Sequence, residues 1–533
     1  MIIALGLAAQ AGPAFAQSVR RVELPALANS ESNITLPLGD RGVLVLTKTD
    51  RLGYQLTKYN TDLERDWSLN GQLPENLDFV ASTFDGQGAV YLLFSSYRLP
   101  MCQVVKVSIG PGFSEQFSLS VVERFQVTHF KTLGGGLFIG GIISDKGLTL
   151  QKGPSLLMLG ESMLTSTGGD DISVLYHTHL SARKARLLPG GERGSAIQSL
   201  ETDSIHGRIT ASFTVKRGRE LKLVANVYDE FGQDQGHSVV EPAPDYALLS
   251  GRLSVLDDST RIVVGNYGYQ AMQANGIASS QGLYLSRVGE GRTAQTSYVS
   301  FTDFKNFFNY LDPREQERMA RKAQKRKEAG SDLQLNYRLL VHELIRHNDQ
   351  YVVVAEAFYP EFRYQSTSPY GATSWYGWRY SPLSYYSLYN PYMWNPWFGS
   401  RGLSAQQVFD GYVYTHAVVA GFDATGKLLW DNCLELTPER SIDLQEKVRL
   451  VKQGDQLALY HNHKGHIQQT IIRANGMAEQ QPRIDISALT TAQRAQAIIS
   501  DDVRYWHDRY FLAWGYRKTE NRQTVFYLDK IQF

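Results

Sequence analysis

The residues of this chain best suited to chemistry are histidines that stand close together. His461, His463 and His466 surround a Lys-Gly pair, and His177 and His179 alternate in the same way. Imidazole binds zinc when three or four ligands converge, but no carboxylate near the first group completes such a set. Lys-Gly is also ordinary turn chemistry. We therefore interpret both groups as polar strand and hairpin residues, and we predict no metal site and no cofactor.

Glycine-rich turns offer less chemistry. Residues 168–171 read Gly-Gly-Asp-Asp, which could offer carboxylates to a cation but is also common turn sequence. Gly134-Gly135-Gly136 has no helix after it, so it does not indicate a phosphate cradle. The chain contains no Gly-x-Ser-x-Gly elbow, no P-loop and no His-Glu-x-x-His pair. Paired carboxylates for glycoside cleavage could still come from distant segments, which sequence spacing does not test.

An aromatic-rich insertion at residues 358–402 is the most distinctive segment. Sixteen of the 41 residues from 358 to 398 are aromatic, and five prolines there oppose regular helix and central strand. Such a loop could stack on a protein or glycan partner, contact a membrane interface, or pack on itself as a lid. Our candidate ligand-binding residues are Tyr376, Trp378, Tyr386, Trp394 and Trp397.

Composition and the N-terminal residues indicate the compartment. The 54 basic and 53 acidic residues leave a net charge of +1, which argues against nucleic-acid binding. Residues 1–16 are apolar and end in Ala14-Phe15-Ala16, typical of a signal peptide cleaved before Gln17, although the usual basic start is missing. The alternative is a buried N-terminal element, which Gly12-Pro13 would interrupt. We expect an exported protein, periplasmic or extracellular, with no transmembrane segment and a possible peripheral contact with the envelope.

Two cysteines, Cys102 and Cys433, stand far apart in the sequence. In an oxidising compartment they could pair, or they could remain two buried thiols, and two cysteines carry no spacing signature that decides between these outcomes.

Short apolar strands separated by Gly, Asp and Asn turns recur along the chain. They fall into eight groups of mostly four strands, the first near residues 29–70 and the last near 502–533. The pattern predicts an all-β fold over residues 17–533, a single β-propeller of about seven or eight four-stranded blades. Residues 19–24 could complete the last group and close the ring, which removes exposed strand edges. A row of β-sandwich domains is the competing architecture.

A charged helical insertion at residues 302–333 interrupts the strands. Asp312 suits the N-cap, Pro313 the first helical position, and Gly330 the stop. The body of this helix is charged on almost every side, so it is either a solvated excursion or a docking arm for an acidic partner. The preceding aromatic residues would tether it, namely Phe301, Phe304, Phe307, Phe308 and Tyr310.

One repeat resembles a known family. Residues 420–430 contain Asp423, Gly426, Lys427 and Trp430, in the spacing of quinoprotein-dehydrogenase-like (PQQ-like) propeller repeats, and residues 59–67 are a looser copy. The resemblance implies a propeller in which Trp430 docks neighbouring blades. The family's adjacent cysteine pair is absent, so the resemblance implies no quinone-dependent oxidation.

From these observations we predict a non-catalytic binding or scaffolding propeller that recognises a protein or glycan partner through its aromatic loop. The alternative is a carbohydrate-active enzyme with carboxylates at the propeller centre. Carboxyl groups of raised pKa in a central pocket would favour the enzyme.

Overall fold

The computed structural model describes most of the strands and one charged helix. The described residues are 17–25, 33–96, 98–143, 172–191, 195–217, 220–255, 261–270, 279–288, 295–330, 333–335, 337–342, 344–364, 407–436, 440–441, 446–463, 466–473, 475–481, 484–485, 500–518 and 523–532. The predicted signal segment 1–16 and the turn 168–171 lie outside them. None of the helices in these ranges has the length and apolar character to cross a membrane.

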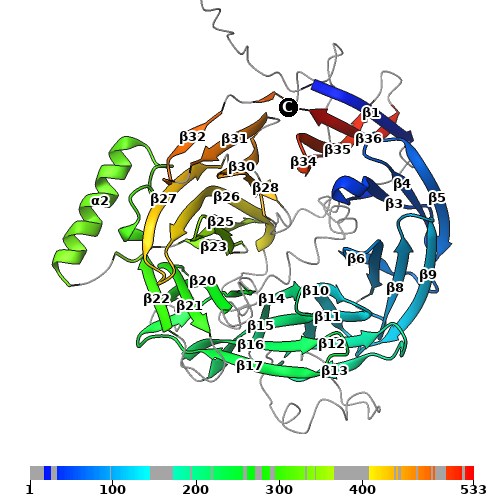
Figure 1. Ribbon diagram of the computed structural model, residues 1–533, viewed down its shortest axis with the longest axis horizontal. Coiled ribbons are helices and arrows are strands. Elements are labelled where there is room, and N and C mark those ends of the chain that lie inside the picture. The colour runs from blue at the N-terminus through cyan, green and yellow to red at the C-terminus, as the bar shows by residue number, and fades with distance from the viewer. Residues whose placement is uncertain are drawn as a thin grey trace, which may run out of the picture.

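Eight antiparallel sheets follow one another in chain order around a ring (Figure 1). Blade 1 is β2 (Asn33–Pro37), β3 (Val43–Lys48), β4 (Gly53–Tyr59) and β5 (Arg65–Gln72). Blade 2 is β6 (Asp78–Phe84), β7 (Ala89–Ser95), β8 (Met101–Ser108) and β9 (Phe113–Ser120). Blade 3 is β10 (Phe125–Leu133), β11 (Gly136–Ile143), β12 (Ile172–His179) and β13 (Arg186–Leu188). Blade 4 is β14 (Ser195–Asp203), β15 (Arg208–Arg217), β16 (Glu220–Asp229) and β17 (Asp234–Val240).

The second half of the ring repeats this order with additions. Blade 5 is β18 (Tyr246–Leu248) with β19 (Arg252–Val255), then β20 (Arg261–Tyr269), β21 (Gly282–Val288) and β22 (Gln295–Ser300). Blade 6 is β23 (Arg338–Val341) with β24 (Ile345–His347), then β25 (Gln350–Tyr364), β26 (Gln407–Phe422), β27 (Leu428–Glu435) and the short β28 (Arg440–Ser441). Blade 7 is β29 (Val448–Gln453), β30 (Gln456–His463), β31 (His466–Ile472), β32 (Ala478–Gln480) and β33 (Ile484–Asp485). Blade 8 is β34 (Ser500–His507), β35 (Tyr510–Lys518), β36 (Thr524–Gln532) and β1 (Gln17–Pro25). The prediction of an all-β propeller is confirmed, with eight blades.

The hydrophobic core lies mainly between neighbouring blades. The second strands β7 and β11 are buried along their whole length, whereas the outer strand β5 alternates between exposed and half-buried residues. Because an inner strand has a blade on each side, it carries apolar residues on both faces, and an outer strand carries them on one face only. The buried clusters accordingly join blades 1 and 2, blades 2 and 3, and blades 8 and 1.

Blade 8 closes the ring because its outermost strand comes from the other end of the chain. β1 pairs antiparallel with β36 from Gln17 opposite Gln532 to Pro25 opposite Val525. Arg21 contacts Asp529 at 2.7 Å, which fixes the strand in this register. The expectation that the two ends share a sheet is confirmed, and this pairing covers an edge of β36 that would otherwise be exposed.

The turn between the third and fourth strands is the same in several blades. In blade 6, Asp423 Oδ1 accepts hydrogen bonds from the amides of Thr425 at 2.8 Å and Lys427 at 3.0 Å, and Gly426 takes a φ of +83°. Asn60 in blade 1 and Asp229 in blade 4 accept the corresponding amide hydrogen bonds. A side-chain oxygen at the first position and a left-handed residue at the fourth therefore form the turn.

A tryptophan after two of these turns packs against the next blade. Trp430 on β27 lies so close to Gly476, in the β31–β32 turn of blade 7, that a Cβ built there would be 2.3 Å from its ring. Trp67 on β5 meets Gly112 of blade 2 in the same way, and its Nε1 donates to Ile109 O at 2.8 Å. The predicted docking role of Trp430 is confirmed in its geometry.

The charged insertion forms α2 (Pro313–Glu328), which projects from the rim beside blade 6 (Figure 1). Asp312 accepts hydrogen bonds from the amides of Arg314 and Glu315, as expected of an N-cap, and Gly330 has a φ of +69° just after the helix. Phe301, Phe304 and Phe307 are buried against blades 5 and 6 and hold the base of the insertion.

Candidate functional site

Charged side chains on or beside the inner strands of blades 4, 5 and 7 form a connected ionic cluster. Arg252 on β19 donates Nε to Glu201 of β14 at 3.0 Å and Nη1 to Glu446 at 2.9 Å. Glu446 stands just before β29 and also accepts from Arg449 at 2.9 Å. Since these residues come from three different blades, one guanidinium links blades 4, 5 and 7. We call Glu201, Arg252, Glu446 and Arg449 the central ionic cluster.

A buried carboxylate next to this cluster attaches blade 7 to blade 6. Glu356 on β25 is fully buried, and its Oε1 lies 2.8 Å from His342 Nε2. The same carboxylate accepts the backbone amides of Lys447 and Val448, each at 2.8 Å. A buried charge costs free energy unless it is paired and hydrogen-bonded, and here the partners are an imidazole and two amides. Glu356 therefore positions the segment that carries Glu446.

The electrostatics of the central ionic cluster favour the ionised form of Glu446. Burial raises the pKa of Glu446, but the charges of His342, Arg252 and Arg449 outweigh burial, so that its pKa lies below the ordinary value. Burial lowers the pKa of Arg252, and its two glutamate partners more than compensate and raise it. A general acid for glycoside cleavage needs the opposite, a carboxyl of raised pKa. Carboxylates do converge between the inner strands, but as members of ion pairs.

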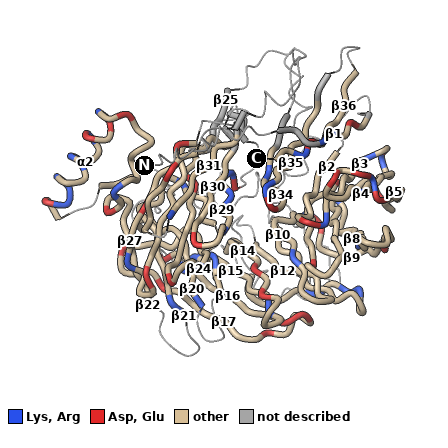
Figure 2. The backbone as a smooth tube through the Cα atoms, turned by 45° about the horizontal axis from the view of Figure 1, so that its top comes forward, with Lys and Arg blue, Asp and Glu red and all other residues tan. Residues whose placement is uncertain are grey.

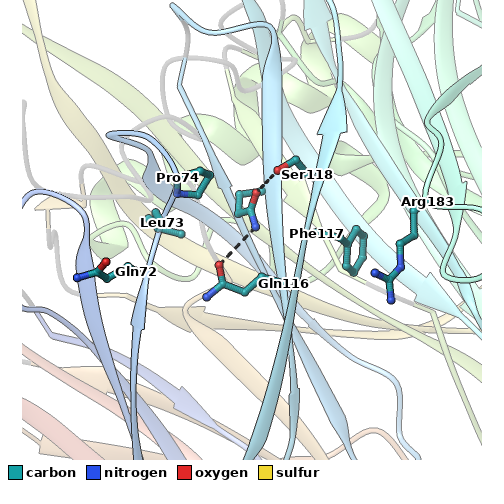
Figure 3. Close-up of a pocket in the computed structure, with 8 residues that line it drawn as sticks. Gln72, Leu73, Pro74, Gln116, Phe117, Ser118 and Arg183 are labelled. Carbon is teal, nitrogen blue, oxygen red and sulfur yellow. Dashed lines mark hydrogen bonds between the residues drawn. The ribbon is translucent and has the colours of Figure 1, made fainter.

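A pocket of about 660 Å³ lies on the outer part of blades 1 to 3 (Figure 3). Its lining side chains are mainly neutral amides and apolar groups: Gln72, Leu73, Pro74, Gln103, Gln116, Phe117, Ser118 and Arg183. Ser118 Oγ donates to Gln103 at 2.6 Å, and Gln116 donates to the Tyr54 hydroxyl at 2.6 Å. Arg183 is engaged with Glu115 and lies over the Phe117 ring. This lining suits hydrogen bonding to a neutral polar ligand, and it contains no carboxyl, imidazole or thiol.

The aromatic-rich insertion is mounted on an extended two-stranded ribbon of blade 6. The inner strand β23 pairs with β25 only as far as Phe358, and the outer strand β27 pairs with β26 only from His416 onward. β25 and β26 nevertheless continue to pair until Tyr364 stands opposite Gln407. Figure 1 shows this ribbon leading from blade 6 toward the middle of the ring, where β28 joins it. The predicted loop of 358–402 therefore begins as regular strand, and its ends are held side by side.

All five candidate ligand-binding residues lie outside the described residues: Tyr376, Trp378, Tyr386, Trp394 and Trp397. What the structure places is the support of their segment, at residues 364 and 407.

The histidines singled out by their spacing have structural partners. His463 pairs with His466 across the β30–β31 hairpin, as expected of a hairpin tip, and His461 is buried on β30. His177 Nε2 lies 3.0 Å from Glu230 O, and His179 stacks on Phe231 at 4.9 Å. His177 and His179 thus join blade 3 to the β16–β17 turn of blade 4. Within the described ranges, no three side chains of metal-ligand type gather.

The two cysteines are free thiols in different blades. Cys102 lies on β8 of blade 2 and Cys433 on β27 of blade 6. Burial raises the pKa of each thiol to about 12. A thiol of that pKa is protonated at neutral pH and therefore a poor nucleophile.

A buried histidine without a complete set of partners lies near Cys433. His416 on β26 is fully buried, and its ring stacks on Tyr310 with 3.9 Å between centroids. Its Nδ1 lies 2.9 Å from Thr415 Oγ1, but Nε2 has no hydrogen-bond partner. Burial lowers the pKa of His416 to about 3, so this imidazole is neutral. The base of the helical insertion thus covers a neutral imidazole.

Comparisons with known proteins give no family for this chain. No protein-family model and no curated protein matches the chain. Among solved structures, the chain is similar to prolyl oligopeptidase B from Galerina marginata, with 7% identity over 92% of this chain and 54% of that one, and a TM-score of 0.38. A mutant of Synechocystis apocarotenoid oxygenase has 8% identity over 51% of this chain and 63% of that one, and a TM-score of 0.30.

The chain covers less than two thirds of either structure's length, and at these scores the likeness carries no argument about activity. The resemblance to quinoprotein-dehydrogenase-like repeats rests on residues 420–430 and 59–67 alone. No family model supports it.

Sequence reasoning missed the central ionic cluster. Its members are charged residues on or beside inner strands, and both partners of Arg252 are distant from it in the chain. One signal was present beside the cluster, because Glu356 interrupts the apolar run of Val352-Val353-Val354-Ala355 and Ala357. An ionisable residue inside such a run requires a buried partner.

Proposed function

We propose that this chain is an exported, non-catalytic binding propeller of the cell envelope or the extracellular space, which recognises a protein or glycan partner through the aromatic segment 365–406. The observation that carries the proposal is the β25–β26 ribbon. Two strands that extend well past their neighbours in the blade, with paired ends, provide a support for the segment that joins them. Tyr and Trp are the side chains that most often supply binding energy at such surfaces.

The charge arrangement favours binding over catalysis. The central carboxylates Glu201 and Glu446 are both bound to Arg252, and Glu446 has a lowered pKa. The alternative, a carbohydrate-active enzyme, needs a proton donor near neutral pH and has less support from this arrangement. The resemblance of residues 1–16 to a signal peptide supports the location. We propose that the quinoprotein-like repeat reflects shared blade docking by Trp430 and not a shared activity.

The ribbon register allows a clean deletion of the recognition segment. Tyr364 and Gln407 are register partners, so a two-residue Asn-Gly turn can replace residues 365–406 and close the hairpin. We would compare this variant with the chain of residues 17–533 in co-sedimentation with cellulose, chitin, peptidoglycan and envelope fractions. Loss of binding in a variant of unchanged melting temperature supports the proposal.

A substitution series identifies the residues responsible. Alanine at Tyr376, Trp378, Tyr386, Trp394 and Trp397 is expected to abolish binding. The matched control carries alanine at five other tyrosines of the segment, namely Tyr370, Tyr380, Tyr385, Tyr389 and Tyr392. Equal binding by the intact chain and the deletion variant would contradict the proposal and place the site on the ring, where the pocket beside Gln103 becomes the first candidate.

A further inference from the structure

The helix α2 concentrates positive charge that the rest of the protein lacks. Its 16 residues contain seven Lys or Arg and three Glu, which leaves the helix at +4, whereas the whole chain is at +1. The remaining residues therefore sum to −3. Figure 2 shows basic residues along α2, which stands away from the body of the propeller. A charge separation of this kind is an electrostatic feature of the surface and contributes nothing to the fold.

Five of these cations form a stripe along one side of the helix. At 100° per residue they fall within an arc of about 100° and extend over about 17 Å of helix. The stripe consists of Arg314, Arg318, Arg321, Lys322 and Lys325. We call these five residues the basic stripe. All five are exposed, whereas the half-buried residues Gln316, Met319 and Ala323 occupy the side that faces the body.

Intramolecular partners account for only part of the basic stripe. Arg318 pairs with Glu315 at 3.0 Å and Arg321 with Glu317 at 3.7 Å, and these pairs are largely exposed and therefore weak. Arg314, Lys322 and Lys325 have no acidic partner within the described residues. The helix buries no residue fully, and among the residues that the structure describes no ion pair ties the basic stripe to the propeller, although Lys327, outside the stripe, pairs with Asp303. Its charge is therefore available to an external anion.

The shape and composition of the exposed side distinguish between possible partners. Stable protein interfaces have an apolar or aromatic centre and few lysines, and the exposed side of α2 offers no such group. A flat anionic surface needs no apolar anchor, and it can meet a helix that projects beyond the rest of the molecule. The residues outside α2 carry a net negative charge, so an anionic surface would repel that part of the molecule. Only α2 would then face the surface.

We propose that the basic stripe of α2 is a contact site for an anionic phospholipid membrane surface. The contact is electrostatic and peripheral, since the exposed side carries no apolar residue to insert into the acyl region. It would hold the propeller with the rim at blade 6 next to the bilayer. This inference is independent of partner recognition by residues 365–406, and each can fail without the other.

Vesicle flotation of the chain of residues 17–533 tests the contact. We expect the protein to float with vesicles of phosphatidylcholine containing 30% phosphatidylglycerol, not with phosphatidylcholine alone, and to dissociate in 0.5 M NaCl because salt screens surface charge. Substitution of the five residues of the basic stripe by glutamine should weaken partitioning by roughly tenfold or more. Circular dichroism and the melting temperature show whether the variant keeps its fold.

A control variant separates the basic stripe from net charge. It carries five glutamines in place of exposed cations on other blades: Arg51, Arg98, Lys131, Lys184 and Lys452. The control should bind anionic vesicles as the unsubstituted chain does. The proposal would be overturned by an equal loss of vesicle binding in both variants, or by no vesicle binding of the unsubstituted chain. Binding to soluble poly-glutamate without binding to vesicles would also overturn it and would indicate an acidic protein partner.

Discussion

Single residues in this propeller have measurable effects on stability, and the effect of the buried His416 is the clearest. Its pKa is about 3 in the folded chain, against about 6.5 for an unperturbed imidazole. As the pH falls below 6.5, the unfolded chain binds a proton at this position that the folded chain does not bind. Stability therefore decreases as the pH falls through this interval and is fully present above it.

The variant His416→Phe should lose less stability in acid, because phenylalanine does not titrate. Between pH 7 and pH 5 we expect the free energy of unfolding of the unsubstituted chain to fall by about 2 kcal/mol more than that of the variant. Urea denaturation at the two pH values measures this difference. His237→Phe, at an exposed position, is the control, and an equal pH response of His416→Phe and the unsubstituted chain would contradict the lowered pKa.

Arg252 lends itself to a second test, since it is the cation shared by Glu201 and Glu446. Arg252→Met leaves two partly buried carboxylates without their common partner, and we expect the free energy of unfolding to fall by about 3 kcal/mol. The triple variant, with glutamine at both glutamates as well, should recover most of that loss because no unpaired charge remains. If the triple variant were no more stable than Arg252→Met, packing and not charge would explain the effect.

Among the structural elements, the turn between the third and fourth strands has a testable role in blade docking. Gly476 and Gly454 both have positive φ, so alanine is strained at either position. At Gly476 the new Cβ would also meet Trp430 at 2.3 Å, whereas at Gly454 nothing lies within 4 Å. We expect Gly454→Ala to cost about 1 kcal/mol and Gly476→Ala about 2 to 3 kcal/mol, measured by urea denaturation. Equal costs would mean that Trp430 does not hold blade 7 against blade 6.

The sequence predicted the elements better than it predicted their side-chain contacts. Eight strand groups, the N-cap at Asp312 and the turn at Asp423 could be identified because periodicity and turn chemistry are local. The central ionic cluster could not, since Arg252 is 51 residues from Glu201 and 194 residues from Glu446. Only the closed ring brings these residues together, and no local pattern encodes that contact. The ribbon was interpreted as loop because Pro360 and the aromatic residues around it obscured the strand pattern of β25.

For the whole molecule, closure of the ring by β1 is the feature on which integrity depends. A chain that begins at residue 26 leaves the edge of β36 unpaired, and an unpaired edge recruits other strands. We expect this variant to self-associate and to melt at least about 5 °C below the chain of residues 17–533. Light scattering after size-exclusion chromatography and a thermal scan measure both effects. Arg20→Gln, which keeps the strand and removes only an exposed ion pair with Glu64, should change neither.

The antiparallel register of β1 also gives the ring a direction of mechanical weakness. Gln17 lies opposite Gln532, so a force that pulls these two residues apart acts on one pair of backbone hydrogen bonds at a time and peels the strand away. A force applied between Gln17 and Val525 instead runs along the strands and loads all of these bonds together. The β1–β36 pairing should therefore open at low force when Gln17 and Gln532 are pulled apart, and at higher force when Gln17 and Val525 are. Single-molecule pulling from these two pairs of attachment points would measure the difference.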